Sequence, residues 1–160
     1  MWNTTTYRPT NEGCLMRQVV YPNFCPVCIE GLWLHLLKRV DLIDNISVSC
    51  PSTPNQGISI GVELLYLAHL RKPEEKHLGI KESYYMLWKH DGVVVDPWTN
   101  STAVEIRPDL AGGHWEVVVE FSTPEVRKDE QGYLVGQRNF TLVDVCSLER
   151  NGRTGQTVFL

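Results

Sequence analysis

The chain has 160 residues, of which 42% are hydrophobic, and a chain of this size buries one good core, or one core plus a short docked segment. Two full-sized domains are therefore not expected. A net charge of −4, with the Lys and Arg residues scattered along the sequence, provides no basic surface for nucleic acid or for an anionic membrane, so we expect neither partner.

The N-terminal stretch MWNTTTYRPT contains neither a basic segment nor an apolar run of the kind that forms a signal peptide. Other features nevertheless suit a secreted protein, because the chain has 5 cysteines and several N-x-S/T glycosylation sequons. The sequons begin at Asn3, Asn45, Asn100 and Asn139. We therefore expect a secreted glycoprotein whose leader and upstream region are missing from this chain, and the odd number of cysteines fits such a loss.

An irregular, turn-rich loop is predicted from Tyr7 to about Phe24, because this stretch shows no sustained hydrophobic periodicity. Its turn-forming residues are Pro9, Asn11, Gly13, Pro22 and Asn23.

One amphipathic helix is predicted next, from Pro26 to about Val40. Pro26 suits the first turn of a helix, while Lys38 and Arg39 suit the last turn. Its apolar stretch is too short to span a bilayer. The apolar residues that lie near helical spacing are Val27, Leu32, Trp33, Leu36, Leu37 and Val40.

Short alternating runs between turn signals then predict an antiparallel β-sandwich from about residue 42 to residue 147, so the fold class is mostly β. Asp91 and Gly92 stand between two of these runs as a tight hairpin turn. The spacing of the runs, together with Trp88 on the third, indicates an immunoglobulin- or fibronectin-like sandwich. The polar tail from residue 148 to residue 160 is expected to be flexible. The predicted strands are ISVSC, GISIGVELLYL, SYYMLWK, VVV, TAVEI, HWEVVVEFS and RNFTLVDV.

No complete catalytic site is visible in the sequence. A catalytic zinc needs about three protein ligands, and helical metallopeptidases take two of them, together with a Glu base, from an H-E-x-x-H motif. None of the 5 histidines begins that motif. We therefore expect no metal ligand and no general base of this type in the chain.

The cysteines near the predicted helix leave three interpretations open. Cys25 and Cys28 form a C-x-x-C at a helix start, where the helix dipole lowers a thiol pKa, but no parallel-strand pattern supports a thioredoxin-like redox site. A structural zinc would need further ligands, and the remaining cysteines have no knuckle spacing. The interpretation we favour is a disulfide from Cys14 to Cys25 or Cys28 that braces the loop.

A second disulfide is expected between Cys50 and Cys146, which flank the proposed sandwich on its first and last strands. Closing a loop of this length contributes about 4–5 kcal/mol in the chain-entropy model.

The segment YRPTNEGCLMR, followed by FCPVC and the helix, resembles the C-terminal part of the catalytic domain in the IgA-peptidase-like zinc metallopeptidases, a metzincin-type family. The resemblance covers Tyr7–Val40, about a fifth of the chain. It implies that residues 1–41 are a remnant of a metallopeptidase catalytic domain, followed by the β-sandwich and the flexible tail.

The resemblance also implies residue roles. Met16 matches the Met-turn methionine, whose side chain forms an apolar floor under the zinc-binding histidines without touching the metal. Tyr21, Pro22, Asn23 and Phe24 are then expected to help wall the substrate pocket.

The chain departs from the family at the metal site. In the family the H-E-x-x-H helix and the third ligand precede the Met-turn, and here no histidine precedes Met16. The zinc and the peptide substrate therefore belong to the full-length family, and this chain is expected to be inactive without an upstream catalytic segment.

Two other functions remain open. One is a secreted β-sandwich binding module for carbohydrate or protein, with Trp98, Trp115 or Tyr84 as contacts. The other is a redox protein that uses Cys25 and Cys28.

Overall fold

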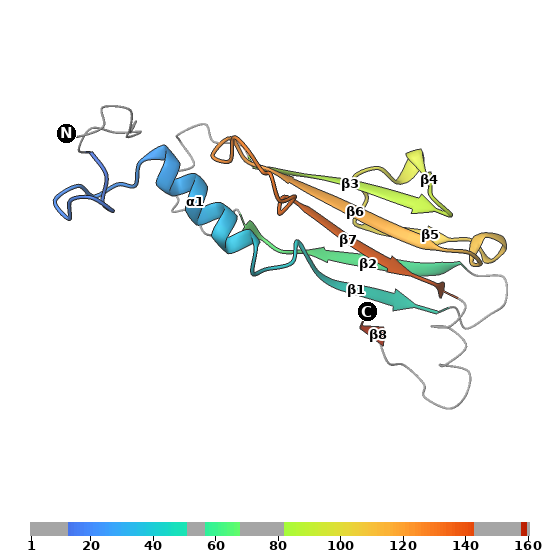
Figure 1. Cartoon of the computed structure of the whole chain (residues 1–160). Coiled ribbons are helices and arrows are strands. Elements are labelled where there is room, and N and C mark those ends of the chain that lie inside the picture. Colours follow the sequence, from blue (N-terminus) through green and yellow to red (C-terminus); the bar gives the residue numbers. More distant parts are fainter. Residues whose placement is uncertain (1–12, 51–56, 68–81, 143–157, 160) are drawn as a thin grey trace.

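The computed structural model describes residues 13–50, 57–67, 82–142 and 158–159, and these form an elongated molecule with a sandwich at one end and a helix projecting from it (Figure 1). Within the described residues, the short 3-10 helices η3 and η4 lie in loops of the sandwich. No helix in the described parts of the chain has the length and apolarity that crossing a bilayer requires. The elements are α1 (Pro26–Leu37), β1 (Ile43–Ser49), β2 (Ile58–Leu64), β3 (Ser83–His90), β4 (Val93–Val94), η3 (Asp96–Trp98), β5 (Ala103–Ile106), η4 (Pro108–Leu110), β6 (Trp115–Ser122), β7 (Val135–Phe140) and β8 (Val158–Phe159).

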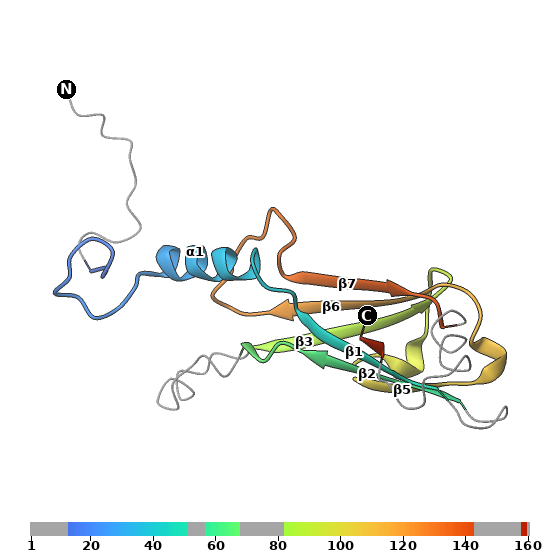
Figure 2. The same cartoon turned by 90° about the horizontal axis from the view of Figure 1, so that it is seen from below.

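The strands form two antiparallel sheets, with strand orders β5-β2-β1-β8 and β4-β3-β6-β7. The chain changes sheet after β2, after β4, after β5 and after β7, and the first three of these changes also occur in immunoglobulin-type sandwiches. The two layers are seen best in Figure 2. The predicted mostly-β fold, with one helix before an antiparallel sandwich, is confirmed.

The core lies between the sheets, and the strands fill it by alternation. In β6, Trp115, Val117, Val119 and Phe121 are buried, whereas the residues between them face outward. Trp88 of β3, which indicated the sandwich in the sequence, is fully buried. Its Nε1 donates a hydrogen bond to the Ser101 carbonyl at 2.9 Å. The alternating pattern therefore determined which face of each strand turns inward.

Helix α1 is packed onto one end of the sandwich. Trp33 and Leu37 belong to the same apolar cluster as the strands. The Trp33 ring centroid lies 5.6 Å from that of Phe121, and Trp33 Nε1 donates to Glu125 Oε2 at 2.6 Å. Glu30 accepts hydrogen bonds from the Arg127 guanidinium and from the backbone of Arg127. The helix is thus fixed to the connection between β6 and β7.

The helix ends at Leu37, earlier than the predicted end near Val40. After it the chain turns into β1, because Asp41 Oδ1 accepts a hydrogen bond from the Ile43 amide at 3.1 Å and Ile43 is buried. Tertiary burial here overrides the helical preference of the residues that follow Leu37.

The hairpin between β3 and β4 is confirmed. Asp91 has φ 48° and Gly92 has φ 80°, and two successive positive φ values define the type I′ turn that suits the twist of paired strands.

Two strand predictions were wrong in position. Strand β7 begins at Val135 and ends at Phe140, so it starts three residues before the predicted RNFTLVDV run. Val158 and Phe159 pair with β1 as β8, so these two residues do not belong to a wholly flexible tail. The bounds of both strands depend on backbone pairing with a strand that is distant in the sequence. Local sequence patterns do not reveal such pairing.

Candidate functional site

A tight turn precedes α1 and brings Cys14 back toward the start of the helix. The amides of Arg17 and Gln18 donate to the Cys14 carbonyl at 2.9 and 3.0 Å. The Leu15 amide donates to the Asn23 carbonyl at 2.9 Å, which closes the loop at its base. We call residues 14–21 the apical loop.

Three thiols meet below the apical loop. Cys25 is the N-cap residue of α1 and Cys28 lies in its first turn. The sulfur atoms of Cys14, Cys25 and Cys28 all lie within 4.8 Å of one another, and the Cys14 and Cys28 sulfurs are 3.5 Å apart. Cys14 and Cys25 are buried, whereas Cys28 is partly exposed. We call these residues the three-cysteine cluster.

The predicted disulfide from Cys14 to Cys25 or Cys28 is wrong, because none of the three cysteines is disulfide-bonded. A bonded sulfur pair would be about 2.05 Å apart. The apical loop brings three sulfurs, rather than two, to one point.

Hydrogen bonding within the cluster holds Cys28 in its protonated form. The hydrogen bond with Cys14, the hydrogen bond with Cys25 and burial together raise the pKa of Cys28 from 9.0 to about 12. A redox C-x-x-C motif needs an accessible thiolate. Cys25 is 5% exposed and Cys28 is protonated near neutral pH, so the geometry argues against the redox interpretation.

Converging sulfurs can instead bind a thiophilic metal ion. Within the described residues, the three-cysteine cluster is the group of His, Cys, Asp and Glu side chains that meets the distance requirement of a metal site. The sequence argument against zinc relied on the absence of knuckle spacing, and it missed this group. The available signal was a third cysteine within one loop of a C-x-x-C.

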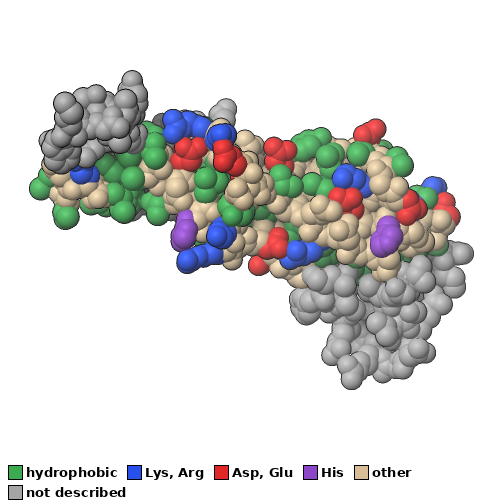
Figure 3. Space-filling view, viewed as in Figure 1, with side chains coloured by type: hydrophobic (Ala, Val, Ile, Leu, Met, Phe, Trp, Pro, Cys, Tyr) green, Lys and Arg blue, Asp and Glu red, His purple; other side chains and the backbone are tan. Residues whose placement is uncertain are grey.

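The apical loop exposes large apolar side chains. Met16 is 72% exposed, Val19 89% and Val20 82%. Figure 3 shows hydrophobic side chains gathered at the end of the molecule where α1 begins. Met16 lies in a tight turn, but its side chain lacks the burial expected of a Met-turn residue.

The residues expected to wall a substrate pocket lie at the base of the same loop. Tyr21 is 37% exposed, Pro22 and Asn23 are exposed, and Phe24 is half-buried. Their role at a substrate pocket stays a prediction.

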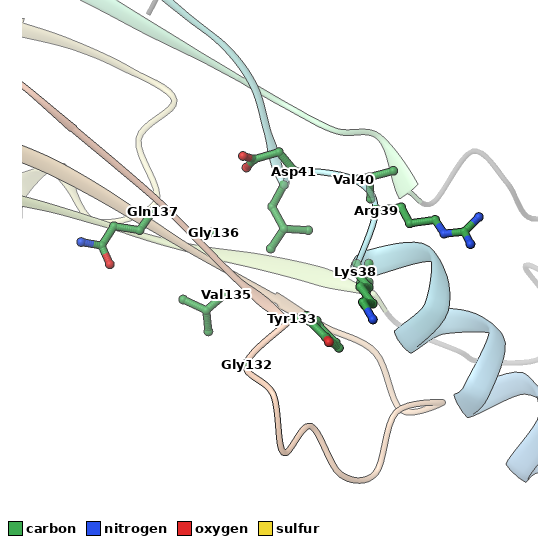
Figure 4. Close-up of a pocket in the computed structure, with 11 residues that line it drawn as sticks. Lys38, Arg39, Val40, Asp41, Gly132, Tyr133, Val135, Gly136 and Gln137 are labelled. Atoms are coloured by element: carbon green, nitrogen blue, oxygen red, sulfur yellow. The ribbon is translucent and has the colours of Figure 1, made fainter.

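An open pocket of about 430 Å³ lies elsewhere, between the α1–β1 connection and β7 (Figure 4). Lys38 and Arg39 line one side, and Gln137 lines another. Beside it, Arg138 forms an ion pair with Asp41 at 2.6 Å. It contains no cluster of nucleophilic or acid–base groups, and we assign it no chemistry.

The aromatic residues proposed as ligand contacts are largely structural. Trp115 is 1% exposed and stacks between His90 and Trp98, at centroid distances of 4.3 and 5.5 Å. Tyr84 donates its hydroxyl to the Leu65 carbonyl and packs on Phe121. The expectation that Trp115 contacts a ligand is wrong, because the ring is enclosed in the core.

The remaining predicted modification sites are partly described. Asn100 and Asn139 are exposed, Asn45 is half-buried, and Asn3 lies outside the described residues. Cys50 takes part in a disulfide, but its expected partner Cys146 lies outside the described residues, so the pairing stays a prediction.

The catalytic zinc of the metallopeptidase family that the chain resembles does not fit the described residues. The sequence contains no H-E-x-x-H motif, and among the described residues only the three-cysteine cluster has metal-binding geometry. Comparison with known proteins adds no assignment: no protein-family model, no curated protein and no solved structure matches the chain.

Proposed function

We propose that this chain supplies the C-terminal part of a secreted zinc endopeptidase and docks, through its apical loop, against a catalytic segment that carries the zinc ligands and the general base. Two observations support the proposal. The first is the resemblance of Tyr7–Val40 to the IgA-peptidase-like metallopeptidases. The second, which carries most of the argument, is the exposure of Met16, Val19 and Val20 on one short loop.

Exposed apolar side chains of this size are costly unless another surface covers them. Single exposed hydrophobic residues are common, but a gathered group at one end of a molecule marks an interaction site. A methionine suits such a contact because its unbranched side chain adapts to an irregular surface. The apical loop therefore has the chemistry of a docking surface.

Helix α1 holds this docking surface at a defined place. Trp33 and Glu30 fix the helix to the sandwich, and the apical loop lies a few residues before the start of this helix. The outer flanks of the helix are also apolar, since Val27 is 42% and Leu32 51% exposed. The helix is thus positioned to contact the sandwich on one side and a catalytic segment on another.

The isolated chain is not expected to hydrolyse peptides, because it has no H-E-x-x-H motif to bind zinc and activate water. The measurement is hydrolysis of a fluorogenic peptide library with added zinc. Chelator-sensitive hydrolysis by the purified chain would contradict this expectation.

The docking step is tested in the joined protein. The transcript is read upstream of the Met1 codon, and an in-frame H-E-x-x-H segment is expressed together with this chain. We expect Met16→Asp and Val19→Asp to lower peptide hydrolysis at least about tenfold, because a buried carboxylate without a partner costs well over 1.4 kcal/mol.

The matched control is Val93→Asp, because Val93 is 70% exposed but lies on the β3–β4 hairpin of the sandwich. It should leave hydrolysis unchanged. Equal activity of Met16→Asp and Val93→Asp would overturn the docking surface, and a transcript without an in-frame H-E-x-x-H segment would overturn the proposed function.

The binding-module alternative has less support. Of the aromatic residues that suggested it, Trp115 is buried and Tyr84 is hydrogen-bonded into the sandwich. No observation on the sandwich surface favours carbohydrate over protein as a ligand.

A further inference from the structure

The three-cysteine cluster has the dimensions of a thiolate metal site. In tetrahedral zinc sites the Zn–S distance is about 2.3 Å, which places neighbouring sulfurs about 3.8 Å apart. The Cys14 and Cys28 sulfurs are 3.5 Å apart, and no pair of sulfurs in the cluster exceeds 4.8 Å. Small side-chain rotations therefore suffice to place all three around one ion.

The backbone around the cluster favours negative charge on the sulfurs. The Cys25 amide donates a hydrogen bond to the Cys14 sulfur at 3.3 Å. Cys25 and Cys28 lie at the N-terminal end of α1, where the helix dipole stabilises anions. A backbone donor of this kind orients a metal ligand.

Protonated thiols do not explain why three cysteines converge. Three neutral thiols gain little from one another, and three thiolates repel at this separation. In a secreted protein they would also be exposed to oxidation. A divalent cation removes both difficulties, because it replaces the thiol protons and protects the sulfurs from oxidation.

We propose that Cys14, Cys25 and Cys28 bind one Zn²⁺ through their three sulfurs. Each ligating thiol releases one proton on binding, and the fourth position of the tetrahedron is taken by water or by a donor from another segment. This site is separate from the catalytic zinc of the proposed peptidase, and it is structural: it ties the apical loop to the start of α1.

The site is built so that it can be tested without unfolding the molecule. Cys14, Cys25 and Cys28 lie outside the apolar cluster of the sandwich. Replacing any one of them should therefore leave the sandwich folded, which near-ultraviolet circular dichroism of its tryptophans will report.

The test uses the whole chain, reduced and freed of metal. Zn²⁺ is titrated against a chromogenic chelator, and we expect one ion per chain with an apparent affinity that rises from pH 6 to pH 8 as protons are released. X-ray absorption of the zinc-loaded chain should show three sulfur ligands at about 2.3 Å. Cys14→Ser, Cys25→Ser and Cys28→Ser should each lower affinity by about 100-fold or more, beyond the loss that follows removal of an outer-shell contact.

The matched control is His35→Ala, on the exposed side of the same helix, and it should bind zinc as the unmodified chain does. Absence of zinc binding by the folded, reduced chain would overturn the proposal, as would binding that survives the serine substitutions or a spectrum with two or fewer sulfurs. Because these readouts need no peptidase activity, the proposed function can fail while the zinc site stands, and the reverse also holds.

Discussion

At the scale of single residues, Cys28 shows how neighbours control a side chain. Hydrogen bonds with Cys14 and Cys25, with burial in addition, raise its pKa to about 12. The same thiol in an unstructured peptide is partly ionised near pH 8, so its chemistry depends on the loop that brings Cys14 beside it.

Alkylation of the metal-free chain measures this shift. At pH 8 a pKa raised by about three units leaves ~1000-fold less thiolate than an ordinary cysteine has, so Cys28 should react with iodoacetamide far more slowly than a model peptide. The rate should keep rising with pH well above 9, where the rate of an ordinary cysteine levels off. The double variant Cys14→Ala, Cys25→Ala removes the hydrogen bonds to Cys28 and should restore the reactivity of an ordinary cysteine. If Cys28 of the unmodified chain already reacts at the rate of the model peptide, its pKa is not raised. Peptide mass spectrometry gives the rates.

Trp33 is the residue that joins the helix to the core. Its ring packs on Phe121 and its Nε1 is hydrogen-bonded to Glu125. Trp33→Ala should lower the free energy of unfolding by about 3–5 kcal/mol, because a large buried ring is replaced by a cavity. Leu32→Ala is the control on the neighbouring position, which is 51% exposed, and urea unfolding should show little change for it. Similar losses for the two variants would mean that α1 is not anchored through Trp33.

At the scale of elements, α1 depends on a charged contact as well as on an apolar one. The Arg127 side chain and the Arg127 and Lys128 amides hold the pKa of Glu30 below 4.5. A carboxyl group whose pKa is lowered by folding stabilises the native state above its unfolded pKa, and this stabilisation is lost as pH falls through the folded pKa. The helix should therefore be held less firmly in acid.

Glu30→Gln tests this contact. At pH 7 the variant should unfold at lower urea concentration than the unmodified chain, and the difference should shrink as pH falls from 4.5 through the lower pKa that Glu30 has in the folded chain. Glu130→Gln is the control, because its ion pair with Lys128 is exposed on both sides and such pairs contribute little. A difference that stays constant down to pH 3 would show that the charge of Glu30 is not responsible.

At the scale of the whole molecule, the sandwich and the apical loop lie at opposite ends of an elongated body, with α1 between them (Figure 1). The apolar cluster includes α1 through Trp33 and Leu37 but contains none of residues 13–25. The unit that folds around one core therefore extends from about Pro26 into the sandwich. That residues 1–41 belong to a catalytic domain remains a proposal. It concerns a further segment that would contact these residues.

Two truncations distinguish these parts. Removing residues 1–24 should leave the urea midpoint of the sandwich nearly unchanged, because the described residues among them contribute no buried side chain to the core. Removing residues 1–40 deletes Trp33 and Leu37. Loss of one large buried side chain costs about 3–5 kcal/mol, and this truncation should destabilise the sandwich by at least that amount. Equal stability of the two truncated chains would argue that α1 is an appendage.

Features that depend on local periodicity and backbone preference could be predicted from the sequence alone. Alternation predicted the strands, including the β6 segment in which Trp115 and Val117 are buried. The Asp91–Gly92 pair predicted a tight hairpin turn, which the structure forms with two positive φ values. Pro26 correctly marked the start of α1. These signals lie within a few residues of one another in the chain.

Contacts between residues far apart in the chain became visible only in the folded structure. Cys14 joins Cys25 and Cys28 because the apical loop folds back on itself, and spacing along the chain could not show three sulfurs at one point. The apolar residues of α1 divide into Trp33 and Leu37, which the sandwich covers, and exposed residues such as Leu32. Helical periodicity identifies apolar positions, but the neighbouring elements determine which of them are buried, and that information is carried by long-range packing.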